Sequence, residues 1–220
     1  MDKENFDNEV AMYYDEVIEK GYHDNEKYLS KLLKIMKKGE RVLELGCGTG
    51  KILLELLERG IFAEGLDVSK SMIEKLKSKN NKAIIHISNL DDFNFDKKYD
   101  YALSCNGPFS IKGDEIESYI LDKNEIIKIL QKYTKIAKKG LLINIGTEKP
   151  ELKIPLKDNG IFIHRETKIE DYTIMINFIF QKEKVIGVKT FVKKRYKIND
   201  ILKNVKIRDL GNFKLIQFWA

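Results

Sequence analysis

One segment constrains the fold of this chain more than any other: VLELGCGTG at residues 42–50, where an apolar run leads directly into a turn with three glycines. Glycine adopts backbone conformations that other residues rarely reach, so Gly46, Gly48 and Gly50 allow a sharp turn and a close approach of a ligand to the main chain. Helical periodicity follows at residues 51–59. A strand, a glycine turn and a helix in this order predict an open α/β sheet whose ligand lies at the carboxyl ends of the strands.

The segments on either side extend this pattern over most of the chain. Apolar runs predict strands at residues 41–46, 61–67, 82–87, 99–105 and 140–146, and three- and four-residue spacing predicts helices at residues 25–37, 51–59, 69–79 and 122–139. Near-continuous Val, Ile and Leu runs are typical of parallel strands with both faces covered. The Gly211-Asn212 pair, between strands predicted at 205–210 and 213–219, indicates an antiparallel hairpin at an edge of the sheet.

After Thr147 the pattern changes to runs without helical periodicity. Residues 161–166, 172–181 and 185–196 are rich in Ile, Phe, Tyr, Val and Thr, and they predict an antiparallel β meander inserted after the fifth strand. We therefore expect a single domain over residues 1–220, with an N-terminal helical cap at 1–38 and a β-rich lid insertion at 151–198.

The composition favours a globular protein that stays inside the cell. The chain is 43% hydrophobic and 34% charged, which is typical of a folded domain. Its two cysteines cannot build a disulfide framework, so a reducing compartment is expected. The N-terminus is polar and acidic, unlike a signal peptide, and no apolar run approaches the ~18 residues of a membrane span. We expect a cytoplasmic protein that does not bind membranes.

The net charge of +6 is unevenly distributed along the chain. Residues 1–120 contain 18 Lys and Arg against 23 Asp and Glu, whereas residues 121–220 contain 22 against 11. The basic residues at 182–208 would favour an acidic substrate if they gather at the lid; otherwise they form the solvated face of amphipathic strands. Without an added binding domain or a platform of Arg and aromatic residues, they give little support to a nucleic acid partner.

The spacing of the glycines and the charge beside them indicate the ligand. The dinucleotide fingerprint is G-x-G-x-x-G, whereas this chain has G-x-G-x-G. Glu44 precedes the turn, and a fixed carboxylate is unfavourable beside a pyrophosphate but favourable beside an ammonium group. Asp67, at the end of the second predicted strand, can accept hydrogen bonds from both hydroxyls of a ribose. S-adenosylmethionine offers that ammonium and ribose without a phosphate, which disfavours a nicotinamide-dependent oxidoreductase; a glycine turn without a ligand is the remaining alternative.

These residues lie within a longer resemblance to the class I S-adenosylmethionine-dependent methyltransferases. VLELGCGTG is similar to the glycine motif of that family, GLDVSKSMIEKLK at 65–77 to its second-strand motif, and SNLDDFNFDKKYDYALSC at 88–105 to its adenine-contacting region. The resemblance covers residues 10–147 and the final hairpin. It implies a Rossmann-like, doubly wound, mostly parallel seven-stranded α/β sheet of order 3-2-1-4-5-7-6, with strand seven antiparallel.

The resemblance also implies which residues contact the cofactor. Glu44 and the three glycines would border the methionine part, Asp67 would hold the ribose, and the Leu90 amide would face the adenine ring. Asn89, or Asp91 in a shifted register, would accept a hydrogen bond from the adenine amino group. The full implied set is Tyr14 (or Tyr13), Glu44, Gly46, Cys47, Gly48, Gly50, Asp67, Val68, Met72, Asn89, Leu90 and Cys105. No metal ligands are expected.

The candidate catalytic residues are Asn106 and His164. SCNGPFSI at 104–111 is similar to the Asn/Asp-Pro-Pro-aromatic motif of amino-group methyltransferases, in which the Asn oxygen accepts from the amine. Here Gly107 replaces the first Pro, and a turn that only lines the pocket is the alternative. His164, in the first strand of the lid, is the candidate base, although a lone strand histidine is more often structural.

The β insertion resembles the lids of small-molecule methyltransferases. The sequence therefore predicts an enzyme that transfers a methyl group from S-adenosylmethionine to an amine or hydroxyl of a small metabolite, an anionic one if the basic residues reach the lid. A nucleic acid or protein methyltransferase and a non-catalytic cofactor-binding module are the alternatives. The sequence does not predict the oligomeric state.

Overall fold

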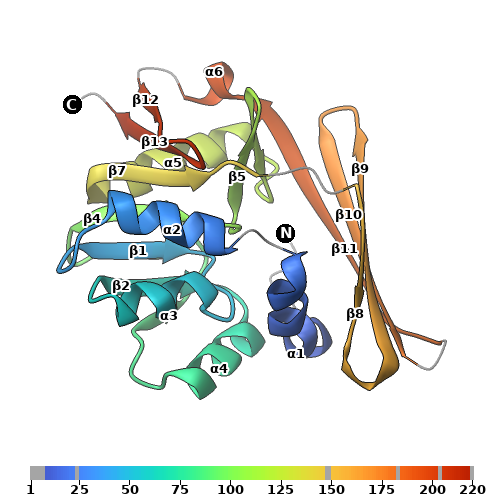
Figure 1. The fold of residues 1–220 in the computed structure, drawn as a ribbon. Helices are drawn as coiled ribbons and strands as arrows, with labels where there is room; N and C mark the ends of the chain where they lie inside the picture. The colour runs from blue at the N-terminus through green and yellow to red at the C-terminus, as the bar shows by residue number, and fades with distance from the viewer. Residues whose placement is uncertain (1–7, 23–24, 147–149, 182–183, 203–204, 219–220) are drawn as a thin grey trace.

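The chain folds around a seven-stranded sheet of order β12-β13-β7-β4-β1-β2-β3 (Figure 1). We analysed a computed structural model that describes residues 8–22, 25–146, 150–181, 184–202 and 205–218. The strands of this sheet are β1 Arg41–Leu45, β2 Phe62–Asp67, β3 Ile85–Ile87, β4 Tyr99–Ser104, β7 Ala137–Asn144, β12 Val205–Asp209 and β13 Phe213–Phe218. The first five run parallel, and β13 pairs antiparallel with both β7 and β12. The predicted fold class, including the edge hairpin, is confirmed.

Helices cover both faces of the sheet. They are α1 Asn8–Val17, which continues into a π-helical turn at Ile18–Tyr22, then α2 Asn25–Ile35, α3 Lys51–Glu58, α4 Lys70–Lys79, α5 Lys123–Ile136 and α6 Ile198–Ile201. Alternate residues of β1 point to opposite faces: Val42 packs with α2 and α3, and Leu43 packs with α5. Figure 1 shows α2 and α3 in front of the sheet and α5 behind it. This two-sided burial explains the continuous apolar runs of the strands.

Two element boundaries differ from the sequence prediction. The helix predicted to end at residue 139 ends at Ile136, and β7 begins immediately at Ala137. Within β7, Gly140 lies against β13: a Cβ at Gly140 would be 2.5 Å from the Ile216 carbonyl oxygen. The strand predicted at 82–87 is also shorter, since β3 pairs with β2 only over residues 85–87.

A second, six-stranded antiparallel sheet stands beside the first. Its order is β5-β6-β11-β10-β9-β8, and its strands are β5 Phe109–Lys112, β6 Glu115–Ser118, β8 Glu151–Pro155, β9 Gly160–Ile169, β10 Tyr172–Gln181 and β11 Lys184–Lys197. The predicted meander corresponds to β9, β10 and β11. The hairpin β5–β6 was not predicted, and it joins this sheet by pairing β6 with β11. The second sheet therefore combines residues 109–118 with the lid predicted at 151–198.

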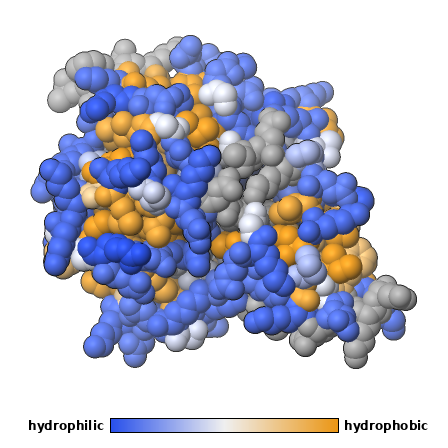
Figure 2. Space-filling view, viewed as in Figure 1, coloured by the Kyte–Doolittle hydropathy of each residue, from blue (hydrophilic) through white to orange (hydrophobic). Residues whose placement is uncertain are grey.

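Helix α1 lies between the two sheets (Figure 1). Its Val17 is buried against Ile154, Phe162 and Ile179 of the second sheet. Apolar side chains also gather on the surface of this sheet, at the right of the view in Figure 2. The exposed ones are Ile161, Ile169, Val185, Val188 and Val192. Within the described part of the chain, no helix has the length and apolar character needed to cross a bilayer.

Candidate active site

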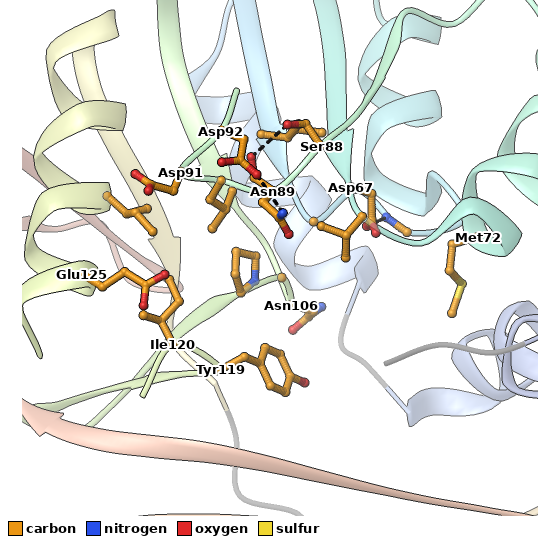
Figure 3. Close-up of a pocket in the computed structure, with 18 of the residues that line it drawn as sticks. Asp67, Met72, Ser88, Asn89, Asp91, Asp92, Asn106, Tyr119, Ile120 and Glu125 are labelled. Atoms are coloured by element: carbon orange, nitrogen blue, oxygen red, sulfur yellow. Dashed lines mark hydrogen bonds between the residues drawn. The ribbon is translucent and has the colours of Figure 1, made fainter. Parts of the chain in front are cut away.

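A cavity of ≈580 Å³ opens at the carboxyl ends of β1, β2 and β4, on the side that faces the second sheet. This volume lies within the range of small-molecule and cofactor sites. Figure 3 shows side chains converging on it from the loop after β2, the loop after β3, the loop after β4 and the segment before α5. Its walls are formed by Tyr14, Gly46, Gly48, Leu66, Asp67, Val68, Met72, Ser88, Asn89, Leu90, Asp91, Asp92, Asn106, Gly107, Pro108, Tyr119, Ile120, Leu121, Asp122, Glu125 and Ile129.

The glycine turn after β1 forms one wall of the cavity. Gly46, Gly48 and Gly50 have φ values of 72°, 52° and 83°, which L side chains rarely adopt. A Cβ at Gly46 would also lie 2.8 Å from the ring of Pro108. The glycine turn and the loop after β4 are therefore packed directly against each other, and together they shape the floor of the site.

Asp67 at the end of β2 is fixed by backbone amides. Its Oδ2 accepts a hydrogen bond from the Gly48 amide at 2.8 Å, and its Oδ1 accepts one from the Ser69 amide at 2.9 Å. Burial raises the pKa of Asp67, against the lowering effect of these two amides. The Val68 amide also lowers this pKa, and because the two carboxylate oxygens offer four acceptor positions, Asp67 can still accept from a ribose hydroxyl.

Glu44 of β1 is buried beneath the glycine turn, with 2% of its surface exposed. Its Oε2 has no hydrogen-bond partner among the described residues. Burial, and secondarily the charge of Asp67, raise the pKa of Glu44 well above its usual range. An orphaned buried carboxylate oxygen is costly, and a ligand ammonium nearby would relieve that cost. Asp67 lines the cavity and fits the ribose of S-adenosylmethionine, whereas Glu44 lies behind the cavity wall and would face the ammonium from there.

The residues expected around the adenine lie together on the cavity wall. Val68 and Met72 follow β2, while Asn89 and Leu90 follow β3. The Asn89 Nδ2 donates to Asp92 Oδ2 at 2.9 Å, which orients its Oδ1 as the remaining acceptor of the amide. Asp91, the alternative to Asn89, also lines the cavity and is paired with Lys128 at 3.1 Å.

Asn106 lines the cavity, and its side-chain amide is held in place by hydrogen bonds within the protein. Its Oδ1 accepts from Asn144 Nδ2 at 3.1 Å, and its Nδ2 donates to Asn25 Oδ1 at 3.0 Å. Gly107 is required beside it, since a Cβ there would lie 2.2 Å from the Leu45 carbonyl oxygen. Phe109 is fully buried in the core and is not positioned to stack on a substrate. The geometry matches a turn that lines the pocket, the alternative to an amine-binding Asn-Pro-Pro-aromatic motif.

His164 does not line the cavity. It is buried in β9, with its Nδ1 2.7 Å from Asn177 Oδ1 and its Nε2 4.0 Å from Glu166 Oε2. Cys47 and Cys105 are also buried behind the wall, and burial raises the pKa of both thiols, so neither is an activated nucleophile. Gly50 lies behind the wall too, packed against Leu76.

The sequence prediction missed the part of the cavity formed by residues 119–129. Tyr119 follows the unpredicted hairpin β5–β6, and Asp122 and Glu125 lie at the start of α5, where Asp122 Oδ1 caps the helix by accepting from the Glu125 amide at 2.8 Å. The signal available for Asp122 was its position as an N-cap. In the described residues, no cluster of three or more His, Cys, Asp or Glu side chains is arranged to hold a metal ion.

Comparison with known sequences points to one family. A model of the methyltransferase domain matches residues 42–139. MJ1252, an uncharacterized protein of Methanocaldococcus jannaschii, is 28% identical over 196 residues, which cover 84% of this chain and 62% of that protein. The dTDP-3-amino-3,6-dideoxy-alpha-D-glucopyranose N,N-dimethyltransferase of Streptomyces fradiae is 29% identical over 104 residues, which cover 46% of this chain and 40% of that enzyme. The chain thus spans less than two thirds of the length of either curated relative.

Comparison with solved structures points the same way. CalS10, an amino pentose methyltransferase of Micromonospora echinaspora solved with S-adenosylmethionine bound, gives a TM-score of 0.68 at 13% identity, with 96% of each chain covered. At this identity the likeness concerns the fold. The strand order and the glycine turn agree with it: residues 42–139 match the methyltransferase domain, and the chain has the fold of the class I S-adenosylmethionine-dependent methyltransferases.

Proposed function

We propose that this protein transfers a methyl group from S-adenosylmethionine to the amino group of a small molecule. The observation that carries the cofactor assignment is the pair of carboxylates beside the glycine turn: buried Glu44 with an unpartnered oxygen, and half-buried Asp67, which is fixed by backbone amides and lines the cavity. When bound, S-adenosylmethionine supplies an electrophilic methyl group. The residues of this chain hold the cofactor and exclude water, so catalysis would depend mainly on positioning the acceptor in line with that methyl.

The charge of the cavity wall supports an amine as the acceptor. Five carboxylates line it, namely Asp67, Asp91, Asp92, Asp122 and Glu125, and none of the described lining residues is Lys, Arg or His. Such a wall attracts a cationic or amine-bearing molecule and repels a phosphate placed against it. The Streptomyces fradiae relative and CalS10 act on amino sugars by their names, which agrees with a small amine as the substrate class.

The basic residues of the lid give little support to a nucleic acid substrate. Lys194 pairs with Asp171 at 3.6 Å, Arg195 with Glu115 at 3.1 Å, and Lys197 with Asp114 at 3.1 Å. Cations already matched by neighbouring carboxylates have little net field with which to attract a polyanion. These three cations of β11 therefore do not form a continuous basic groove.

Calorimetry tests the cofactor assignment. S-adenosylmethionine and S-adenosylhomocysteine should bind the wild-type protein, and Asp67→Ala should weaken both by about 1–3 kcal/mol, because the ribose loses a charged hydrogen-bond acceptor. Asp96→Ala is the matched control, since Asp96 is exposed and lies outside the cavity wall. Equal affinities of wild type and Asp67→Ala would refute the assignment.

Mass spectrometry then tests the acceptor. A panel should contain amino sugars and the parent sugars in which a hydroxyl replaces the amine. We expect methylation of the amine-bearing members only, because an unprotonated amine needs no base to become nucleophilic whereas a hydroxyl does. Methylation of the parent sugars at the same rate would contradict an amine acceptor.

A further inference from the structure

A cluster of buried charged side chains lies on the inner face of the second sheet, outside the site described above. We call it the lid cluster; it consists of Lys112, Glu117, Glu166 and Lys193, which come from β5, β6, β9 and β11. Lys112 Nζ lies 3.3 Å from Glu117 Oε2 and 2.5 Å from Glu166 Oε1. These four residues are distant in the sequence, and the antiparallel pairing of the sheet brings them together.

Both carboxylates of the lid cluster are occupied by neighbours other than Lys193. Lys112 bridges the two, and the Thr173 hydroxyl donates to Glu117 Oε1 at 2.8 Å. The side chain of His164 lies beside Glu166, with its Nε2 4.0 Å from Glu166 Oε2. These contacts stabilise the two carboxylates in place, and they account for the burial of Lys112.

Lys193 is in a different position. Only 8% of its surface is exposed, and none of the described residues gives its ammonium a hydrogen bond or an ion pair. Its contact is with the face of the Tyr119 ring, whose centroid lies 4.7 Å from the Nζ. A cation–π contact recovers only part of the cost of removing an ammonium from water. The carboxylates of Glu117 and Glu166 also attract the ammonium, but neither forms a direct ion pair with it.

Tyr119 connects this ammonium to the methyl-transfer cavity. The residue lines the cavity with Asn106, and its ring also packs edge-on against Phe191 at 6.3 Å. Figure 3 shows the Tyr119 ring next to Asn106, on the opposite side of the cavity from Ser88 and Asp92. Tyr119 thus contacts both the cavity, which it lines, and the Lys193 ammonium, which lies over its ring.

We propose that Lys193, held over the Tyr119 ring, binds an anionic group of the methyl acceptor, either a carboxylate or a phosphate. The inference rests on the proposed function and narrows its substrate class: the acceptor would carry an amine at one end and an anion at the other. The carboxylates line the cavity itself, whereas the Lys193 ammonium contacts Tyr119 of the wall without lining the cavity, so the two ends of the acceptor would meet opposite charges at different places.

Anion binding can be measured without knowing the acceptor. The protein is saturated with S-adenosylhomocysteine, so that the cofactor site is filled, and then titrated by calorimetry with inorganic phosphate or with acetate. We expect Lys193→Met to weaken binding of at least one of these anions tenfold or more, and Lys193→Arg to retain it. Lys194→Met is the matched control, because Lys194 is the next residue of the same strand, points to the opposite face and pairs with Asp171.

The results separate the possibilities. Anion binding that is equal in wild type and Lys193→Met, or absent from wild type, would overturn the proposal. The melting temperature and the S-adenosylhomocysteine affinity of each variant show whether it is folded, and Lys193→Arg keeps the test valid if Lys193→Met is not. The relative affinities of phosphate and acetate indicate which anion the site prefers.

A second experiment compares the methylation kinetics of two pairs of acceptors. One pair is an amino sugar with and without a phosphate group, and the other is an amino acid and its amide, which lacks the carboxylate. In the wild type, KM should be at least tenfold lower for the anionic member of the preferred pair, and Lys193→Met should abolish that difference with kcat little changed. A fall in kcat shared by Lys193→Met and Lys193→Arg, with anion binding intact, would instead show proton transfer by Lys193 and overturn anion recognition. Failure of the proposed function would appear separately, as loss of cofactor binding or of all methylation.

Discussion

Replacing Glu44 by Gln should stabilise the protein and weaken its cofactor binding at the same time. Without ligand, the wild-type fold buries a carboxylate whose Oε2 has no partner among the described residues. The glutamine side chain has nearly the same shape and carries no charge. A buried unsatisfied charged group costs about 1–3 kcal/mol or more, so the free energy of unfolding of the ligand-free variant should rise by roughly that amount near neutral pH.

The contribution of Glu44 to the free energy of unfolding depends on pH, and the direction of that dependence follows from its raised pKa. The folded protein raises the pKa of Glu44 above the unfolded value near 4.5, so the folded state holds the proton more tightly. The contribution of Glu44 to stability is therefore fully present below pH 4.5 and is lost as the pH rises through the folded pKa. The stabilising effect of Glu44→Gln should grow over the same interval. Cofactor affinity of the wild type should increase over it, because an ammonium ligand favours the ionised carboxylate.

Thermal unfolding and calorimetry check both halves of this prediction. Each kcal/mol should shift the melting temperature of a chain of this length by roughly 2–4 °C. The lost contact to the ammonium should weaken S-adenosylmethionine binding by about 1.5–3 kcal/mol, or roughly 10- to 150-fold.

Glu64→Gln is the matched control for Glu44→Gln. Glu64 is also a buried glutamate, but Lys97, His86 and Tyr99 contact its carboxylate, and these partners lower its pKa against the effect of burial. Its replacement should lower the melting temperature and leave cofactor binding unchanged. The reasoning fails if Glu44→Gln melts earlier than the wild type, as Glu64→Gln should, or if it binds the cofactor equally well.

Three further predictions concern the loops and the lid. Gly107→Ala should lower the melting temperature more than Gly113→Ala, because a Cβ at 107 would meet a carbonyl oxygen at 2.2 Å and a Cβ at 113 would meet nothing within 4 Å; equal losses would contradict this. Asn106→Ala should cost about 1–3 kcal/mol in urea unfolding, since it leaves the buried Asn144 amide unsatisfied, and an unchanged midpoint would argue against that network. His164→Gln should lower stability with unchanged S-adenosylhomocysteine affinity, because His164 lies outside the cavity wall, and a weaker affinity in calorimetry would place it in the site.

The central sheet was predictable because its signals are local. Each parallel strand is a short apolar run, and the Gly211-Asn212 pair marks the edge hairpin. The hairpin β5–β6 also had a local signal, since Gly113-Asp114 separates two four-residue runs that contain apolar residues, but no strand was predicted at residues 109–118. The pairing of this hairpin with β11 had no local signal, because it joins segments that are far apart in the chain.

The residues of the candidate site also divide into those with a local sequence signal and those without one. Gly46, Gly48 and Asp67 were identified because fixed spacing and strand ends determine where they lie. Tyr119 and Lys193 belong to no motif, and only the antiparallel register of the second sheet brings them together. His164 is the opposite case. Its place in the sequence suggested a base, whereas in the structure its ring forms a hydrogen bond with Asn177.

The pairing of β6 with β11 prevents the lid from behaving as a detachable module. Ser118 lies opposite Lys194, so α5, β7 and the strands β8–β10 all intervene in the chain between two neighbouring strands of one sheet. Excising residues 151–198 would leave a two-stranded hairpin with an unpaired edge, which is a template for aggregation. Grafting a lid from a relative would need both segments exchanged together. Substrate range in this scaffold would therefore evolve through substitutions within the sheet more readily than through replacement of whole insertions.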